Sequence, residues 1–176
     1  MRDRHLMLIG LVLIATVVAG AAPWRSLPPC LIDKWAGITA ADDVGNLLGP
    51  EDPNDWGCMG GGAGGLSVTS STGVPLPPPT AVCLLPAFPN PTSTGTTLRF
   101  TLPSASPVSL VAYGKKGNGP HGAFPVRTLV AGEMAAGVYT VLWDGSDDRG
   151  VRLAGGIYRV AMVVGANCVC GDVEIR

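Results

Sequence analysis

The chain has 176 residues, and 12 lysines and arginines stand against 13 aspartates and glutamates. This length allows one domain of ordinary size with extensions, and a net charge of −1 removes the surplus of cations that nucleic-acid binding requires. With 25 glycines and 16 prolines, a helical bundle is excluded, because both residues interrupt helices.

Residues 1–21 have the layout of a secretory signal peptide. Two arginines precede an apolar run from Leu6 to Val18, and the small residues Ala19-Gly20-Ala21 follow as a cleavage site. The apolar run is shorter than the about 20 residues that a membrane-spanning helix needs. We therefore expect cleavage before Ala22 and a secreted or cell-surface protein, which meets the membrane through its signal peptide during export. The alternative is an uncleaved anchor.

The five cysteines, Cys30, Cys58, Cys83, Cys168 and Cys170, all follow the cleavage site. Export favours disulfides, and an odd number of cysteines leaves one thiol over. If the last two lie on a strand, both point to one face and do not bridge each other. We expect Cys83 to pair with Cys168 or Cys170, and Cys30 is near enough in sequence to pair with Cys58. A metal site, or a site shared with a partner, is the alternative for the Cys-x-Cys pair.

Between the signal peptide and the C-terminal part, composition divides the chain. Residues 57–80 hold a glycine tract and a proline run without any charged residue, which is typical of a linker. The short segment 22–56 precedes it. There, Thr39 and Asp42 fit a capping box for a helix over residues 38–49, and Ile38, Val44, Leu47 and Leu48 would form its apolar face.

The C-terminal part, 81–176, reads as an all-β, immunoglobulin-like antiparallel sandwich. Short alternating segments are separated by turns rich in Gly, Pro and Asp. Their number and spacing are typical of a sandwich of about 100 residues. The expected strands are 96–102, 108–113, 126–130, 137–143, 157–164 and 167–175.

Two motifs stand out in this part. One is Phe88-Pro89-Asn90-Pro91, followed by a Thr-rich strand. The other runs from Trp143-Asp144-Gly145 through Asp147 to Gly150, and is followed by Gly156-Ile157-Tyr158. Together they resemble the FlgD-type immunoglobulin-like domain, which is also seen as the C-terminal (type A) sorting domain of proteins exported by the type IX system. The resemblance runs from about residue 84 to 176. It implies a β-sandwich without catalytic residues, used for surface delivery or as an assembly module.

The second motif also has a physical interpretation of its own. Trp143 would fill the space between the two sheets, and Asp144 and Asp147 would accept backbone N–H groups as in Asx-turns. Gly145 and Gly150 would supply the positive φ that such turns require. The alternative is a calcium site built from Asp144, Asp147 and Asp148.

The sequence predicts no enzyme and no cofactor. A catalytic nucleophile needs a general base held at hydrogen-bond distance. The one candidate for this base in the mature chain is His121, and it lies in a loop rich in Gly and Pro that would not hold it in place. We therefore expect a non-catalytic exported protein that meets secretion machinery or cell-surface proteins. The alternative is a structural or binding module of the cell envelope.

Overall fold

The computed structural model describes residues 28–32, 35, 37–50, 55–59, 78–116 and 122–176. The expected signal peptide, residues 60–77 of the expected linker and His121 lie outside the described residues. In the described part of the chain, no helix is long and apolar enough to span a bilayer.

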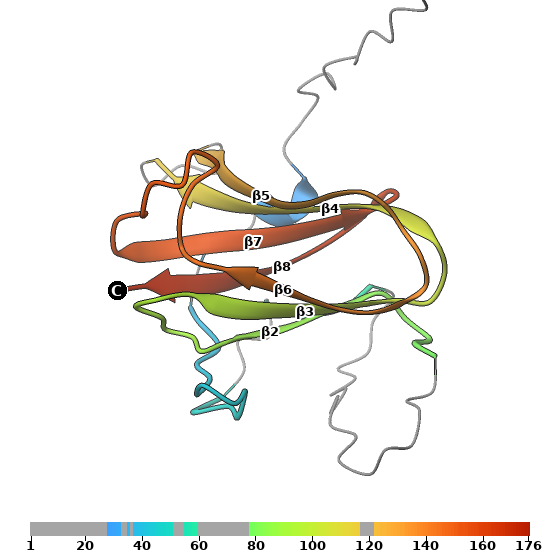
Figure 1. Cartoon of the computed structure of the whole chain (residues 1–176), viewed down its shortest axis with the longest axis horizontal. Helices are drawn as coiled ribbons and strands as arrows, with labels where there is room; N and C mark the ends of the chain where they lie inside the picture. The colour runs from blue at the N-terminus through green and yellow to red at the C-terminus, as the bar shows by residue number, and fades with distance from the viewer. Residues whose placement is uncertain (1–27, 33–34, 36, 51–54, 60–77, 117–121) are drawn as a thin grey trace, which may run out of the picture.

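The described residues form two four-stranded antiparallel sheets packed face to face (Figure 1). One sheet has the strand order β1-β2-β3-β6 and the other β5-β4-β7-β8. The elements are η1 (Pro29–Leu31), β1 (Gly57–Cys58), β2 (Cys83–Phe88), β3 (Thr96–Leu102), β4 (Ser106–Lys115), β5 (Ala123–Met134), β6 (Gly137–Trp143), β7 (Gly156–Val164) and β8 (Asn167–Ile175).

The all-β sandwich expected from the sequence is confirmed. β3, β6 and β8 have the predicted bounds, and each of the other three predicted strands lies within an observed one. Strand β2 was not predicted, because Cys83–Phe88 is a continuous apolar run with a proline and shows no alternation. The register of β2 against β3 shifts between Leu85 and Phe88, and this irregularity accommodates Pro86 within the strand.

The main core lies between the two sheets and is made by alternate residues of each strand, as the pleat of a β-strand requires. In β6, for example, Tyr139, Val141 and Trp143 face inward, while Val138 and Leu142 face solvent. The fully buried members with the largest side chains are Trp143, Phe100, Leu84, Leu98, Leu102, Leu110, Met162, Ile175, Val160 and Val173.

A second, smaller cluster covers the outer face of the β5-β4-β7-β8 sheet. Cys30 and Leu31 of η1 pack there on Ala161 of β7 and Cys170 of β8. Strands β7 and β8 are therefore buried on both faces, the inner by the other sheet and the outer by residues from before the linker. The N-terminal segment is thus part of the folded unit.

Gly57 to Met59, which the sequence assigned to the linker, belong to the folded part of the chain. Gly57 and Cys58 form β1 and pair with Leu84 and Cys83. Just before them, the indole of Trp56 lies so close to Gly171 of β8 that a Cβ atom there would come within 2.2 Å of the ring. Pairing and packing with the sandwich hold these residues in place, although their composition continues into the glycine tract.

The helix expected over residues 38–49 is wrong. Asp42 accepts hydrogen bonds from the backbone N–H groups of Val44 and Asn46, which closes a turn. Ala41 forms bridges with Leu47 and with Asn90. Val44, Leu47 and Leu48 are exposed and form no apolar face. Pairing with the sandwich outweighs the weak helix preference of so short a segment.

Candidate functional site

The Trp143-Asp144-Gly145 motif forms a tight turn at the end of β6. The carboxylate of Asp144 accepts the N–H of Ser146 at 3.0 Å. The carboxylate of Asp147 accepts the N–H groups of Arg149 and Val151, both at 2.9 Å. Gly145 and Gly150 have φ values of 71° and 77°, a region that favours glycine. The carboxylates of this turn therefore hold backbone N–H groups, as the structural interpretation of the motif predicted.

Asp148 of the same turn reaches the neighbouring sheet. Its backbone N–H donates to the carbonyl of Val126 at 3.0 Å, and its carboxylate accepts the N–H of Thr128 at 2.9 Å. Both partners belong to β5, the edge strand of its sheet. The turn thus satisfies backbone groups that would otherwise be open to pairing with another chain.

Hydrogen bonds within the turn already occupy carboxylate oxygens that a calcium ion would need. Asp147 also forms an ion pair with Arg149 at 2.7 Å, so both of its oxygens have hydrogen-bond donors. In the described part of the chain, no group of three or more His, Cys, Asp or Glu side chains is arranged to hold a metal ion. The arrangement favours the structural turn over the calcium alternative.

The pKa of Asp147 lies below its ordinary value of 3.8, chiefly because the N–H of Val151 and then the side chain of Arg149 donate to its charged form. A carboxyl whose pKa is lowered by folding stabilises the protein above its unfolded pKa, and this contribution is lost as the pH falls through the folded pKa. We expect Asp147→Asn to lower the Tm at neutral pH. The gap from the wild type should shrink below about pH 4, and thermal melts over a pH series check this. A gap independent of pH would contradict it.

Trp143 and Tyr158 join the motif to the core. The Trp143 ring is 1% exposed, and its indole N–H donates to the carbonyl of Ser146 at 3.0 Å. Tyr158 of β7 meets it edge-on, with ring centroids 6.0 Å apart, and its hydroxyl donates to the carbonyl of Ala154. Gly156 begins β7 opposite Ile175 of β8. The structure therefore brings the two halves of this motif together.

Asn90, in the Pro-Asn-Pro motif, has a role that the sequence did not reveal. Its side-chain N–H group donates to the carbonyls of Thr39 and Asp172, and its oxygen accepts the N–H of Glu174. Asn90 is fully buried. One side chain thus ties the N-terminal segment to β8. The Pro-Asn-Pro sequence by itself gives no signal for such distant partners.

Arg152 is a second residue that the sequence did not single out. Its guanidinium donates to the carbonyls of Ser93, Thr94 and Asp144. It therefore holds the turn before β3 against the turn after β6. The sequence shows only a single arginine in a loop, which does not reveal hydrogen bonds to carbonyl groups of two separate segments.

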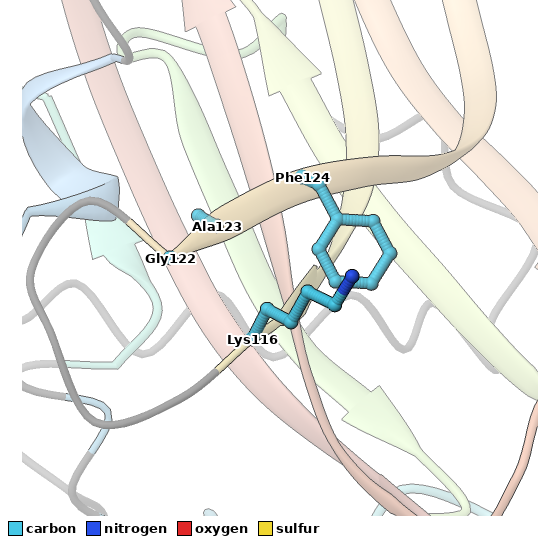
Figure 2. Close-up of a pocket in the computed structure, with 4 residues that line it drawn as sticks. All are labelled: Lys116, Gly122, Ala123 and Phe124. Atoms are coloured by element: carbon cyan, nitrogen blue, oxygen red, sulfur yellow. The ribbon is translucent and has the colours of Figure 1, made fainter.

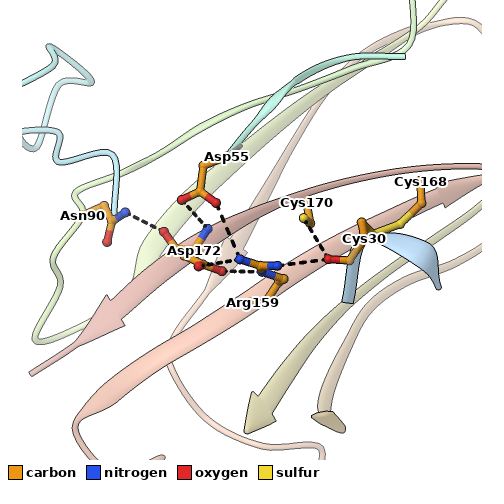
Figure 3. A network of polar contacts seen from close by, with 7 residues as sticks. All are labelled: Cys30, Asp55, Asn90, Arg159, Cys168, Cys170 and Asp172. Carbon is orange, nitrogen blue, oxygen red and sulfur yellow. Dashed lines mark hydrogen bonds and ion pairs between the residues drawn. A yellow bond between two sulfur atoms is a disulfide. The ribbon is translucent and has the colours of Figure 1, made fainter. Parts of the chain in front are cut away.

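A buried ion pair lies on the outer face of β7 and β8, beneath the N-terminal segment (Figure 3). Arg159 and Asp172 are directly opposite each other in the two strands. The guanidinium donates to both carboxylate oxygens of Asp172, at 2.7 and 2.8 Å, and to the carbonyl of Cys30 at 3.0 Å. Asp55 lies 4.0 Å from the same guanidinium.

This ion pair connects three parts of the chain. Burial disfavours the charged form of Arg159, but Asp172 outweighs it, so the pKa of Arg159 is raised. Asp55 also accepts the backbone N–H of Asp172. Because residues 30 and 55 both contribute, the arginine holds the N-terminal segment on the sheet. In the sequence, Arg159 and Asp172 appear as ordinary alternating polar residues of two strands.

The disulfide pairing expected from the sequence is wrong. The structure joins Cys58 to Cys83 and Cys30 to Cys168, with Cα atoms 4.0 and 6.0 Å apart. Leu84 faces the core, so its neighbour Cys83 points out of the first sheet, whereas Cys168 and Cys170 point out of the second, toward η1. The sandwich lies between them, which prevents the bridge from Cys83 to the final strand.

Cys170 is outside both disulfides. Its thiol is buried and lies 3.4 Å from the carbonyl of Cys30 (Figure 3). The expectation that one thiol is left over, and that Cys168 and Cys170 do not bridge each other, is confirmed.

Peptide mapping under non-reducing conditions tests the pairing. We expect two linked peptide pairs, Cys30 with Cys168 and Cys58 with Cys83, and alkylation of Cys170 only after unfolding, because its thiol is buried. A peptide that joins Cys83 to either cysteine of β8 would contradict the structure.

A surface hollow lies at the far end of β4 and β5, lined by Lys116, Gly122, Ala123 and Phe124 (Figure 2). The N–H of Lys116 donates to the carbonyl of Gly122, and the Phe124 ring packs over Gly114. Lys116 is the one ionisable side chain among these lining residues, so they do not form an acid–base pair.

Two packed antiparallel sheets, with a tryptophan between them and an aspartate-rich turn at the end of its strand, define an immunoglobulin-like β-module. Residues 92–167 match the family model of the FlgD Ig-like domain. The chain therefore carries an FlgD Ig-like domain, as the sequence motifs indicated. No curated protein and no solved structure is similar enough to the chain to count as a match.

The family match explains part of the molecule. It begins before β3 and ends at the first residue of β8, so it includes Trp143 and the aspartate-rich turn. Residues 28–59, β2 and nearly all of β8 lie outside it. Both disulfides and Asp172 therefore lie outside the matched residues.

Proposed function

We propose that this protein is a non-catalytic exported protein whose Ig-like module serves sorting to, or attachment at, the cell surface. The observation that carries the proposal is the pair of disulfides within one β-module. Disulfides persist in oxidising compartments outside the cytosol, and the first 21 residues have the pattern of a signal peptide.

The matched FlgD Ig-like domain supports a delivery or assembly role rather than chemistry. The carboxylates of its most distinctive turn accept backbone N–H groups, which is what a scaffold needs. The partners would be secretion machinery or cell-surface proteins, and the module would need no cofactor. The finer proposal is a type IX sorting domain, which rests on the resemblance of the two sequence motifs.

A specific observation favours a second role, that of a module which stays attached in the cell envelope. Cys30–Cys168 and Cys58–Cys83 both join a residue before the linker to one after it. A cut between residues 60 and 77 would therefore not release the N-terminal segment. A sorting tag that is removed after export would have to be cut before Cys30.

Fractionation of the native host distinguishes these roles. We expect the protein at the cell surface or in the medium, with a mature N-terminus near Ala22 by N-terminal sequencing. A mature protein that retains β8 supports the attached module, and loss of the sandwich supports sorting. Protein that stays in the cytosol with Met1 intact would overturn the proposed export.

A further inference from the structure

Each of three of the four sheet edges is either covered in part by another segment of the chain or very short. Along β8, the N–H of Thr92 donates to the carbonyl of Glu174, the N–H of Arg176 donates to the carbonyl of Thr92, and the N–H of Trp56 donates to the carbonyl of Cys170. Asp148 covers part of β5. β1 is only two residues long. Short strands and covering segments are the usual protection against pairing with another chain.

Strand β6 is the exception. It pairs with β3 along all seven residues, from Gly137 to Trp143, and forms the other edge of that sheet. Within the part of the chain that the structure describes, no other segment donates or accepts a backbone hydrogen bond there. The strand contains no charged residue and no proline, which are the side chains that usually protect an edge.

Two of the three outward side chains of this edge are apolar, and the third is the uncharged Thr140. Leu142 is 77% exposed and Val138 is 41% exposed, and Thr140 lies midway between them. The nearest cation on β3 is Arg99, which pairs with Thr140. Its guanidinium lies 4.6 Å from the centroid of the Phe88 ring in β2, on the side of β3 that is away from β6. The edge therefore carries no charge that a second β6 would repel.

We propose that β6 is a homodimer interface, in which the β6 strands of two copies pair antiparallel about a two-fold axis at Thr140. This register places Val138 of each copy opposite Leu142 of the other, so that both exposed apolar side chains find apolar partners. Such an interface uses the same surface on both copies. The two sheets become one continuous sheet of eight strands.

The spacing around Thr140 favours a second copy over an unrelated strand. Any extended segment would satisfy the open backbone groups of β6. In the two-fold pairing, a second β6 already carries apolar residues at the two matching positions. An unrelated strand would need apolar residues at the same spacing. Edge pairing buries less surface than an obligate dimer, so we expect a reversible dimer whose population rises with concentration. The inference is independent of the export route proposed above.

Sedimentation equilibrium of the mature protein, from micromolar to millimolar concentration, tests the dimer. Thr140→Lys places two ammonium groups opposite each other across the axis, and we expect it to weaken dimerisation at least about tenfold. The matched control is Ser109→Lys, on the exposed outer face of β4, which should leave the dimer unchanged. A wild-type protein that stays monomeric throughout, or equal effects of both lysines, would overturn the proposal.

Cysteine crosslinking tests the register. In a pair centred on residue 140, the two copies of Thr140→Cys meet, and mild oxidation should give a covalent dimer that a reductant separates. The two copies of Val138→Cys would lie four residues apart along the strand, about 13 Å, beyond the reach of a disulfide. Crosslinking of Val138→Cys to the same extent as Thr140→Cys would exclude this register.

Discussion

Replacement of Trp143 by alanine is expected to lower the free energy of unfolding by about 3–5 kcal/mol, the range for a buried aromatic side chain in a well-packed core. Trp143 is among the fully buried residues between the two sheets. The substitution would leave a cavity beside Tyr158 and remove the hydrogen bond from the indole to Ser146. Chemical denaturation followed by circular dichroism measures the loss.

The neighbouring residue provides the control. Leu142→Ala, measured in dilute protein, removes an apolar side chain that faces solvent, and we expect a change within about 0.5 kcal/mol. Equal losses for Trp143→Ala and Leu142→Ala would mean that β6 is turned over and that its outward residues form the core.

Replacement of Arg159 by methionine is expected to cost about 3–5 kcal/mol, because it removes the guanidinium that compensates the buried charge of Asp172. Arg159 and Asp172 are 1% and 0% exposed. The same change removes the hydrogen bond to the carbonyl of Cys30 and should loosen the N-terminal segment. Hydrogen exchange of residues 28–32 and 55–59 would report that loosening separately from the global stability.

Two further variants separate the ion pair from packing. Arg149→Met removes the arginine of an exposed pair, whose side chain is 82% exposed, and should cost at most about 1 kcal/mol. The double variant Arg159→Met, Asp172→Leu removes both buried charges and should be more stable than Arg159→Met alone. A double variant that is less stable than the single one would show that the two residues act through packing rather than through charge.

Local patterns in the sequence were sufficient for much of the sandwich. The alternation of Leu98, Phe100 and Leu102 in β3, and of Tyr139, Val141 and Trp143 in β6, determined which residues face the core, because successive side chains of a strand point to opposite faces. The aspartates and glycines after Trp143 determined the turn, since its hydrogen bonds join residues no more than four positions apart. The FlgD-type resemblance depended on these same motifs.

Contacts between distant segments were decided only by the tertiary structure. The disulfide between Cys30 and Cys168 joins residues that are 138 positions apart in the sequence. No local sequence pattern predicts that η1 covers the outer face of β8. Residues 38–49 had the composition of a capped helix, yet they form a turn, and a bridge joins Ala41 to Asn90. Arg159 and Asp172 are buried only because the N-terminal segment lies over them. Strand alternation depends on each chain segment alone, whereas these contacts depend on which surfaces meet once the sheets have formed.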